Sequence, residues 1–258
     1  MINAARQLYP PTRTRPDLRL QAARKTRTGS DEIDFQRVHR AIPDVKQLEE
    51  NRILTGFEPD QFRESYNLLR TQILHRFRKN NWQVLAVTSP GEGEGTSLTA
   101  INLAISIARE IAYSVLLVDA NLRQPRMLDH FGIPARRGLG DYLTGEISVE
   151  ELLVKPGQYE DLVILPGGKP LERSAEMLNS PLMKQLVRQM RSCSENRIVI
   201  FDLPPVLSST DTLSFAAQTD AALLVIEDGY TQKQDLEDAV QRLGNTELVG
   251  TVLNKSQD

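Results

Sequence analysis

The most constraining feature of this sequence is the stretch VLAVTSPGEGEGTSLTAINLA, residues 84–104. It begins as a short apolar run with β-branched residues, which is typical of a buried strand. In the loop that follows, Gly91, Gly93 and Gly95 alternate with two acids, and apolar residues then recur at helical spacing. This order predicts a phosphate-binding loop, because glycine lets backbone N–H groups face an anion at a helix N-terminus.

The loop fits the P-loop pattern G-x-x-x-x-G-K-[ST] only in part. With Ser97 at the hydroxyl position and Gly95 as the last glycine, Thr96 stands where the pattern has lysine and Pro90 where it has the first glycine. A charge-assisted contact is worth roughly 1.5–3 kcal/mol, so its loss would weaken triphosphate binding by about one to two decades. The alternative is a glycine-rich turn that binds no ligand.

Length and charge narrow the class of protein. The 258 residues suffice for one sizeable α/β domain with an extension, and the net charge of −3 argues against a general nucleic-acid binder. The sequence has neither an apolar run of bilayer length nor the pattern of a signal peptide. We therefore expect a cytoplasmic protein, held at the inner face of the membrane only where a partner recruits it.

The segment 1–50 differs in composition from the rest. Arginine and lysine residues are spread among prolines there, with few large apolar residues, which predicts a flexible basic N-terminal arm. Such an arm could touch acidic lipid headgroups or a partner's acidic face, or it could be a solvated tail without a specific role. The segment 51–258 is then the folded domain.

Within that domain, strand patterns alternate with helix patterns. A helix is expected over residues 60–77, where large apolar residues fall on one face at three-to-four spacing. After the glycine loop, further apolar runs predict strands at residues 114–119, 162–165, 197–202, 220–226 and 248–254. The alternation predicts an α/β fold with a doubly wound, mostly parallel sheet flanked by helices, as in P-loop NTPases.

Two of the predicted strands end on an aspartate. Asp202 closes the run RIVIFD, which has the Walker B form of a carboxylate placed to hold magnesium. Asp119 closes SVLLVD, and the carboxyl ends of parallel strands meet at one edge of the sheet, so we expect it near the glycine loop. There it could order magnesium-bound water or take a proton from an attacking hydroxyl; the alternative is a cap for the next helix.

With these residues in view, residues 60–254 resemble the cytoplasmic domain of bacterial tyrosine autokinases, the P-loop family that partners polysaccharide co-polymerases in capsule and exopolysaccharide assembly. The resemblance rests on several ungapped strings together: SPGEGEGTSLTAINLA, VLLVDANLRQPRM, IVIFDLPPVLSSTD, AEMLNSPLMKQL and VGTVLN.

The resemblance implies a MinD-like fold that binds ATP or ADP with Mg²⁺, and a membrane polysaccharide co-polymerase as partner. It implies catalytic roles for Asp119 and Asp202, with Ser97 beside them at the metal. The positions that it assigns to nucleotide binding are Gly91, Gly93, Glu94, Gly95, Thr96, Ser97, Leu98 and Asn254.

The sequence departs from the family at four functional parts. Thr96 stands at the lysine position, and Asn121 replaces the second aspartate of the D-x-D pair that Asp119 begins. The family's E-x-x-R-x-x-R oligomerisation string here reads Glu64, Asn67 and Arg70, without the middle arginine. The family's tyrosine cluster is not matched either, since the last tyrosine is at position 230 and the sequence ends NKSQD.

These departures suggest a regulator of exopolysaccharide or capsule biosynthesis that kept the kinase scaffold, with a possible homo-oligomer through Glu64 and Arg70, but with weakened or lost autokinase activity. The alternative is an active tyrosine kinase or ATPase, in which another cation replaces the missing lysine. A third reading is a MinD- or ParA-like positioning ATPase. It is disfavoured because such relatives need an additional lysine early in the loop, and residues 88–96 contain none.

Overall fold

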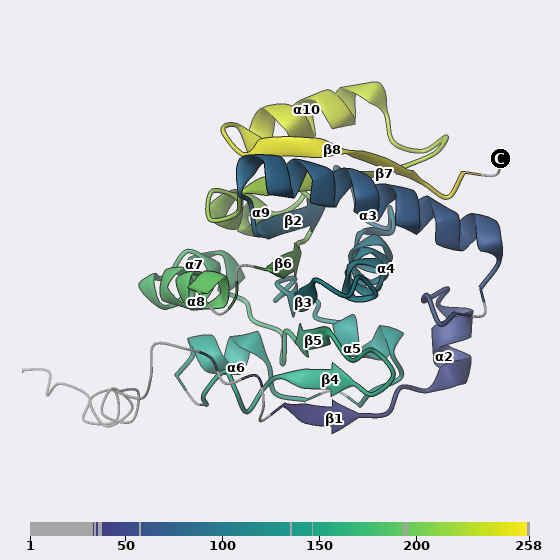
Figure 1. Ribbon diagram of the computed structural model, residues 1–258. Helices are drawn as coiled ribbons and strands as arrows, with labels where there is room; N and C mark the ends of the chain where they lie inside the picture. The colour runs from purple at the N-terminus through teal and green to yellow at the C-terminus, as the bar shows by residue number, and fades with distance from the viewer. Residues whose placement is uncertain are drawn as a thin grey trace, which may run out of the picture. The chain divides into compact units, whose positions relative to one another are not determined.

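An eight-stranded sheet is the centre of the computed structural model (Figure 1), which describes residues 33, 35, 38–56, 58–134, 136–145, 147–192, 194 and 196–256. The strands lie in the order β1-β4-β5-β3-β6-β2-β7-β8. Their bounds are β1 His39–Ala41, β2 Val84–Thr88, β3 Ser114–Asp119, β4 Val154–Pro156, β5 Leu162–Leu165, β6 Arg197–Asp202, β7 Ala221–Glu227 and β8 Glu247–Asn254.

The six strands from β5 to β8 in this order run parallel to one another, while β4 pairs antiparallel with β5 and β1 pairs parallel with β4. The mostly parallel, doubly wound sheet that the sequence predicts is therefore confirmed. Parallel strands are buried on both faces, which is why the central strands read as continuous apolar runs.

Helices cover both faces of the sheet. Their bounds are α2 Val45–Glu50, α3 Asp60–Asn80, α4 Thr96–Ala108, α5 Met127–His130, α6 Leu139–Leu143, α7 Ser174–Leu178, α8 Pro181–Ser192, α9 Thr210–Ala216 and α10 Lys233–Leu243. One buried cluster joins α2, α3, α4 and α5 to the sheet, and a second joins α6 to α10 to the opposite face. None of the described helices is both long and apolar enough to cross a membrane.

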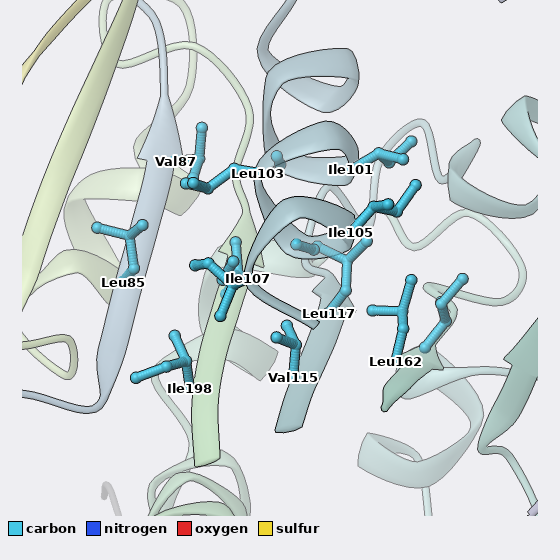
Figure 2. Close-up of a cluster of buried hydrophobic side chains, with 14 of the residues drawn as sticks. Leu85, Val87, Ile101, Leu103, Ile105, Ile107, Val115, Leu117, Leu162 and Ile198 are labelled. Atoms are coloured by element: carbon cyan, nitrogen blue, oxygen red, sulfur yellow. The ribbon is translucent and has the colours of Figure 1, made fainter. Parts of the chain in front are cut away.

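The alternation of side chains along each strand separates the two clusters. On β2, Leu85 and Val87 pack under α4, whereas Val84 and Ala86 face the other layer. Figure 2 shows the first cluster, with side chains of α4 gathered over β2, β3 and β6. This packing fixes α4 against the sheet, and with α4 it fixes the loop that precedes it.

In the described part of the chain, the sheet and its core include residues that precede position 50. β1 adds a strand to the sheet before that point, and Leu48 of α2 is fully buried in the first cluster. Short elements of three and six residues carry too little periodicity to be recognised in a basic, proline-containing segment. The arginines predicted to form the basic arm lie outside the described residues.

Candidate functional site

The predicted site residues lie at the carboxyl ends of the parallel strands, on one edge of the sheet. The loop from Ser89 to Gly95 joins β2 to α4, and the next three predicted residues open α4. Asp119, Asp202 and Asn254 are the last residues of β3, β6 and β8. The fold thus places the residues predicted to bind nucleotide and metal along the edge where ligands bind in open α/β sheets.

The geometry of the glycine loop suits an anion. Gly93 and Gly95 have φ angles of +78° and +91°, in the left-handed region that favours glycine. Gly95 is the N-cap of α4, and no side chain there bonds to the first turn of the helix. Because the first N–H groups of a helix have no partner within it, this 13-residue helix directs donors toward the loop. The chain therefore fits a phosphate group at this place.

The side chain of Thr96 is engaged inside the loop. Its hydroxyl donates to Ser89 Oγ at 2.9 Å, and the Ser89 hydroxyl in turn donates to the carbonyl of Gly91 at 2.7 Å. Two neutral hydroxyls thus brace the loop at the position where the P-loop pattern has a cation.

Glu94 lies buried within the loop, with 2% of its surface exposed. Its carboxylate accepts a hydrogen bond from the N–H of Gly91 at 3.2 Å and another from the hydroxyl of Thr231, after β7, at 2.6 Å. The loop thus carries an internal anion that already uses one backbone donor. The resemblance assigned Glu94 to nucleotide binding, but the sequence gave no sign of Thr231.

Asp119 and Asp202 face each other across the pairing of β3 with β6, at matched positions of the register. Both are almost completely buried. Asp119 accepts from the N–H of Asn121 at 3.3 Å and from that of Met127 at 3.1 Å. These bonds position the Asp119 carboxylate at the end of β3.

Burial changes the protonation of this pair. Removal from water raises the pKa of Asp119 to about 7, against the opposing effect of its backbone hydrogen bonds. Burial, and then the charge of Asp119, raise the pKa of Asp202 to about 8, while a hydrogen bond with the Ser97 hydroxyl acts in the opposite direction. Two carboxylates and one hydroxyl from three elements form an oxygen-rich set of the kind that Mg²⁺ prefers.

The end of β8 and the residue after it contact the glycine loop. Asn254 donates from Nδ2 to the carbonyl of Glu94 at 2.8 Å. Lys255, which the sequence analysis did not single out, donates from Nζ to the carbonyl of Gly93 at 2.9 Å and pairs with Glu227 at 2.7 Å. The available signal was its place directly after Asn254, but a sequence does not show which strand end reaches the loop.

The residues predicted for subunit contact behave differently from one another. Arg70 is half-buried between α3 and α4, where it donates to the carbonyl of Ser106 at 3.1 Å and pairs with Glu110 at 2.9 Å. Glu64 is exposed and accepts a hydrogen bond from Asn67. Arg70 thus holds two helices of its own chain together.

Two of the cavities in the described part of the chain bear on where the site lies. One of about 20 Å³ lies beside the acid pair and is lined by residues that include Asp119, Arg126 and Gly167. A larger one, of about 300 Å³, lies where β7 and β8 begin, at the opposite end of the sheet, and its lining includes Asp220 and Arg242. The larger cavity contains neither the loop nor the paired acids, so size does not identify the site here.

No family model matches this sequence. Among curated proteins, it is 33% identical over 193 residues to the tyrosine-protein kinase YwqD of Bacillus subtilis, covering 74% of this chain and 80% of YwqD. It is 29% identical over 231 residues to the succinoglycan biosynthesis transport protein ExoP of Rhizobium meliloti, covering 88% of this chain but only 27% of ExoP.

Among solved structures, the kinase domain of VpsO superposes with a TM-score of 0.68 at 26% identity, covering 76% of this chain and 96% of that domain. The septum site-determining protein MinD of Pyrococcus horikoshii, solved with Mg-ADP, superposes with a TM-score of 0.56 at 20% identity, over 68% of this chain and 72% of MinD. The similarity to MinD confirms the MinD-like fold and, at this identity, nothing beyond the fold.

Proposed function

Because the chain belongs to the family of bacterial tyrosine-protein kinases, we propose that it is a nucleotide-binding member with weakened or lost kinase activity that regulates exopolysaccharide or capsule biosynthesis. The family relationship supplies the fold and the general chemistry. The threonine at position 96 is one of the four departures that separate this chain from the family pattern.

The observation that carries the proposal is the bracing of the loop by Thr96 and Ser89. A lysine at that position would place a full positive charge at the phosphates, whereas a hydroxyl bonded to another hydroxyl places none. In a loop with no other cation nearby, this contact is worth roughly 1.5–3 kcal/mol in binding, and the effect of its absence on phosphoryl transfer is larger because charge builds up on the transferred group.

The acid pair supports retained binding of Mg²⁺ and nucleotide. Ser97, Asp119 and Asp202 would hold the metal, which supplies positive charge to the phosphate oxygens when bound. The N–H groups of the loop and of the first turn of α4 would hold the phosphates. With its pKa raised to about 7, the Asp119 carboxylate can also accept a proton at neutral pH.

We assign the partner from the named function of a relative. ExoP is a succinoglycan biosynthesis transport protein, and this chain matches about a quarter of it. A separate membrane polysaccharide co-polymerase would then recruit this chain to the cytoplasmic face of the membrane. If the chain also forms a homo-oligomer, exposed Glu64 is available for the contact, while Arg70 is already paired within its own chain.

The proposal is tested by two measurements on the purified protein. In calorimetric titration with Mg²⁺ present, we expect ATP and ADP to bind in the micromolar to submillimolar range. In a second assay with ATP and membranes that contain the co-polymerase, we expect no more phosphotyrosine than in an Asp119→Ala, Asp202→Ala double variant. Robust tyrosine phosphorylation would refute the loss of activity, and no binding at millimolar nucleotide would refute the retained binding.

The second candidate is an active tyrosine kinase or ATPase with an unusual loop. The intact pair Asp119 and Asp202 favours it, because buried carboxylates with raised pKa values are common where catalysis needs them. Release of inorganic phosphate from ATP, abolished in the double variant, would distinguish this candidate from a regulator that only binds nucleotide.

A further inference from the structure

A lysine from the far end of the chain contacts the glycine loop. Lys255 directly follows β8, and its Nζ lies 2.9 Å from the carbonyl oxygen of Gly93, in the middle of the loop. Lys255 thus donates a hydrogen bond from a cationic side chain to the segment 89–97. The loop that lacks a cation of its own therefore has one beside it.

The position of Lys255 is fixed by backbone and side-chain contacts. Asn254, the residue before it, donates to the carbonyl of Glu94 and so ties the end of β8 to the loop. The carbonyl of Asn254 accepts from the N–H of Asp228, which ties the same point to the end of β7. Lys255 itself has a φ angle of +58°, a left-handed conformation that turns the chain away from the strand direction.

The charges around the loop make this cation matter. Glu94 is buried in the loop and Glu92 is exposed on it, so the loop itself contributes only negative side chains. Backbone N–H groups and a helix end provide partial charges, whereas a lysine provides a full one. A nucleoside triphosphate approaching this loop therefore needs a cation that the loop does not contain.

We propose that Lys255 is the cation that binds the nucleotide phosphates at this loop, in place of the lysine that the P-loop pattern puts at the position of Thr96. The proposal rests on the nucleotide binding proposed above. Lys255 has a flexible four-carbon side chain that is 48% exposed, so its ammonium group can leave the Gly93 carbonyl for a phosphate oxygen.

Glu227 is the counter-ion that Lys255 must leave. Their charged atoms lie 2.7 Å apart, and Glu227 stands at the end of β7, with its side chain 21% exposed. A phosphate group with more negative charge competes better for the ammonium group than one with less. The contribution of Lys255 to nucleotide affinity therefore depends on the charge of the phosphate groups. We expect this contribution to increase from AMP to ADP to ATP.

The first test is the affinity of Lys255→Met for AMP, ADP and ATP, by calorimetry with Mg²⁺. We expect ATP affinity to fall about tenfold or more, ADP affinity to fall less and AMP affinity to change least. Lys255→Arg should keep most of the ATP affinity. Lys46→Met, which removes an exposed lysine on α2 far along the chain, is the matched control and should leave all three affinities unchanged.

The second test moves the charge. Thr96→Lys should restore ATP affinity in the Lys255→Met background and change it less than threefold in the wild-type background, where the cation is present. Glu227→Gln should raise ATP affinity, because it frees the ammonium group. A lysine that only held the loop in place would predict the reverse for Glu227→Gln and no rescue by Thr96→Lys.

The outcomes separate this inference from the proposed function. If the wild type binds ATP and Lys255→Met binds it equally well, or loses AMP and ATP affinity to the same degree, the role of Lys255 is refuted and nucleotide binding stands. If the wild type binds no nucleotide, both fail. A large gain from Thr96→Lys in the wild type would also refute the role of Lys255, since the site would then lack its cation.

Discussion

Two parts of the same sheet edge are built in opposite ways. At the ends of β3 and β6, Asp119 and Asp202, the two acids that we propose as ligands of Mg²⁺, are buried and aligned in register. At the loop after β2, Thr96 replaces the lysine and a buried acid, Glu94, occupies a backbone donor. The proposed metal half of the site thus keeps two of the family's acids, although Asn121 replaces a third, and the proposed phosphate half lacks the lysine.

The difference shows that the two halves need not change together. The acid pair is held by strands in the middle of the sheet, whose order and packing involve the whole core. The loop is held by a few hydroxyl, amide and carboxylate contacts that can be exchanged one at a time. Variants at the acids should therefore act through charge that is buried in the core, and variants at the loop through the contacts that hold the loop and through phosphate affinity.

The largest effect is expected from Asp202→Asn in the absence of metal. An aspartate in the unfolded chain has a pKa near 3.8, and burial raises the pKa of Asp202 to about 8. The folded protein therefore loses stability progressively as pH rises from about 4 to 8, because Asp202 must then ionise while buried. Asp202→Asn should raise the free energy of unfolding at pH 8 by roughly 3 kcal/mol or more, and by less at pH 5. Urea unfolding at the two pH values measures this.

The control for that experiment is Asp161→Asn, which changes an exposed aspartate before β5 and should have little effect at either pH. A loss of stability at pH 8 in Asp202→Asn would show that the ionised pair is stabilising. Our inference that ionisation of the buried acids destabilises the fold would then be wrong.

The second effect concerns the join between the loop and β8. A Cβ at Gly95 would lie 2.0 Å from Nδ2 of Asn254, and the φ angle of +91° strains any other residue. Gly95→Ala should lower the free energy of unfolding by roughly 2–3 kcal/mol, about half from strain and half from the displaced amide. Thermal or urea unfolding measures the loss.

Gly145→Ala is a matched control, because Gly145 has a φ angle of +90° and a methyl group added there would meet no atom within 4 Å. It should show the strain without the displacement, roughly 1–2 kcal/mol. Equal losses in the two variants would mean that Asn254 yields without cost and that the end of β8 does not hold the loop.

The third effect tests the acid half as a metal site. Protons compete with Mg²⁺ for Asp119 and Asp202, whose pKa values are raised to about 7 and about 8. In the presence of ADP, the apparent Mg²⁺ affinity should rise at least about tenfold from pH 6 to pH 8. The shift of the melting temperature with Mg²⁺ at each pH measures it, and a pH-independent shift would place the metal elsewhere.

The smallest effect is expected from the internal anion of the loop. Glu94→Gln keeps the shape of the side chain but removes a buried negative charge near the phosphates, so ATP affinity should rise about threefold to tenfold. Glu92→Gln in the same loop is the control, with a smaller gain because solvent screens an exposed charge. Weaker ATP binding by Glu94→Gln would show that its bond to Gly91 matters more than its charge.

Much of the fold could be predicted because the central strands are continuous apolar runs. The strands predicted at residues 114–119, 162–165 and 197–202 have those bounds in the structure. The strand predicted at 220–226 is shifted by one residue at both ends, and the one predicted at 248–254 begins one residue earlier. The helix predicted over residues 60–77 extends to Asn80. Three-residue β1 and β4, at the sheet edge, have too few residues for a periodic signal.

The sequence by itself determined which chemical groups stand at strand ends and in the loop: the glycines, the absent lysine, and the acids Asp119 and Asp202. Only the tertiary structure decided which of them meet. The order of the strands puts β6 between β3 and β2, which aligns the two acids, and it brings Lys255 from the end of β8 onto Gly93. Strand order follows from packing helices on both faces of one sheet, and no local pattern of residues encodes that packing.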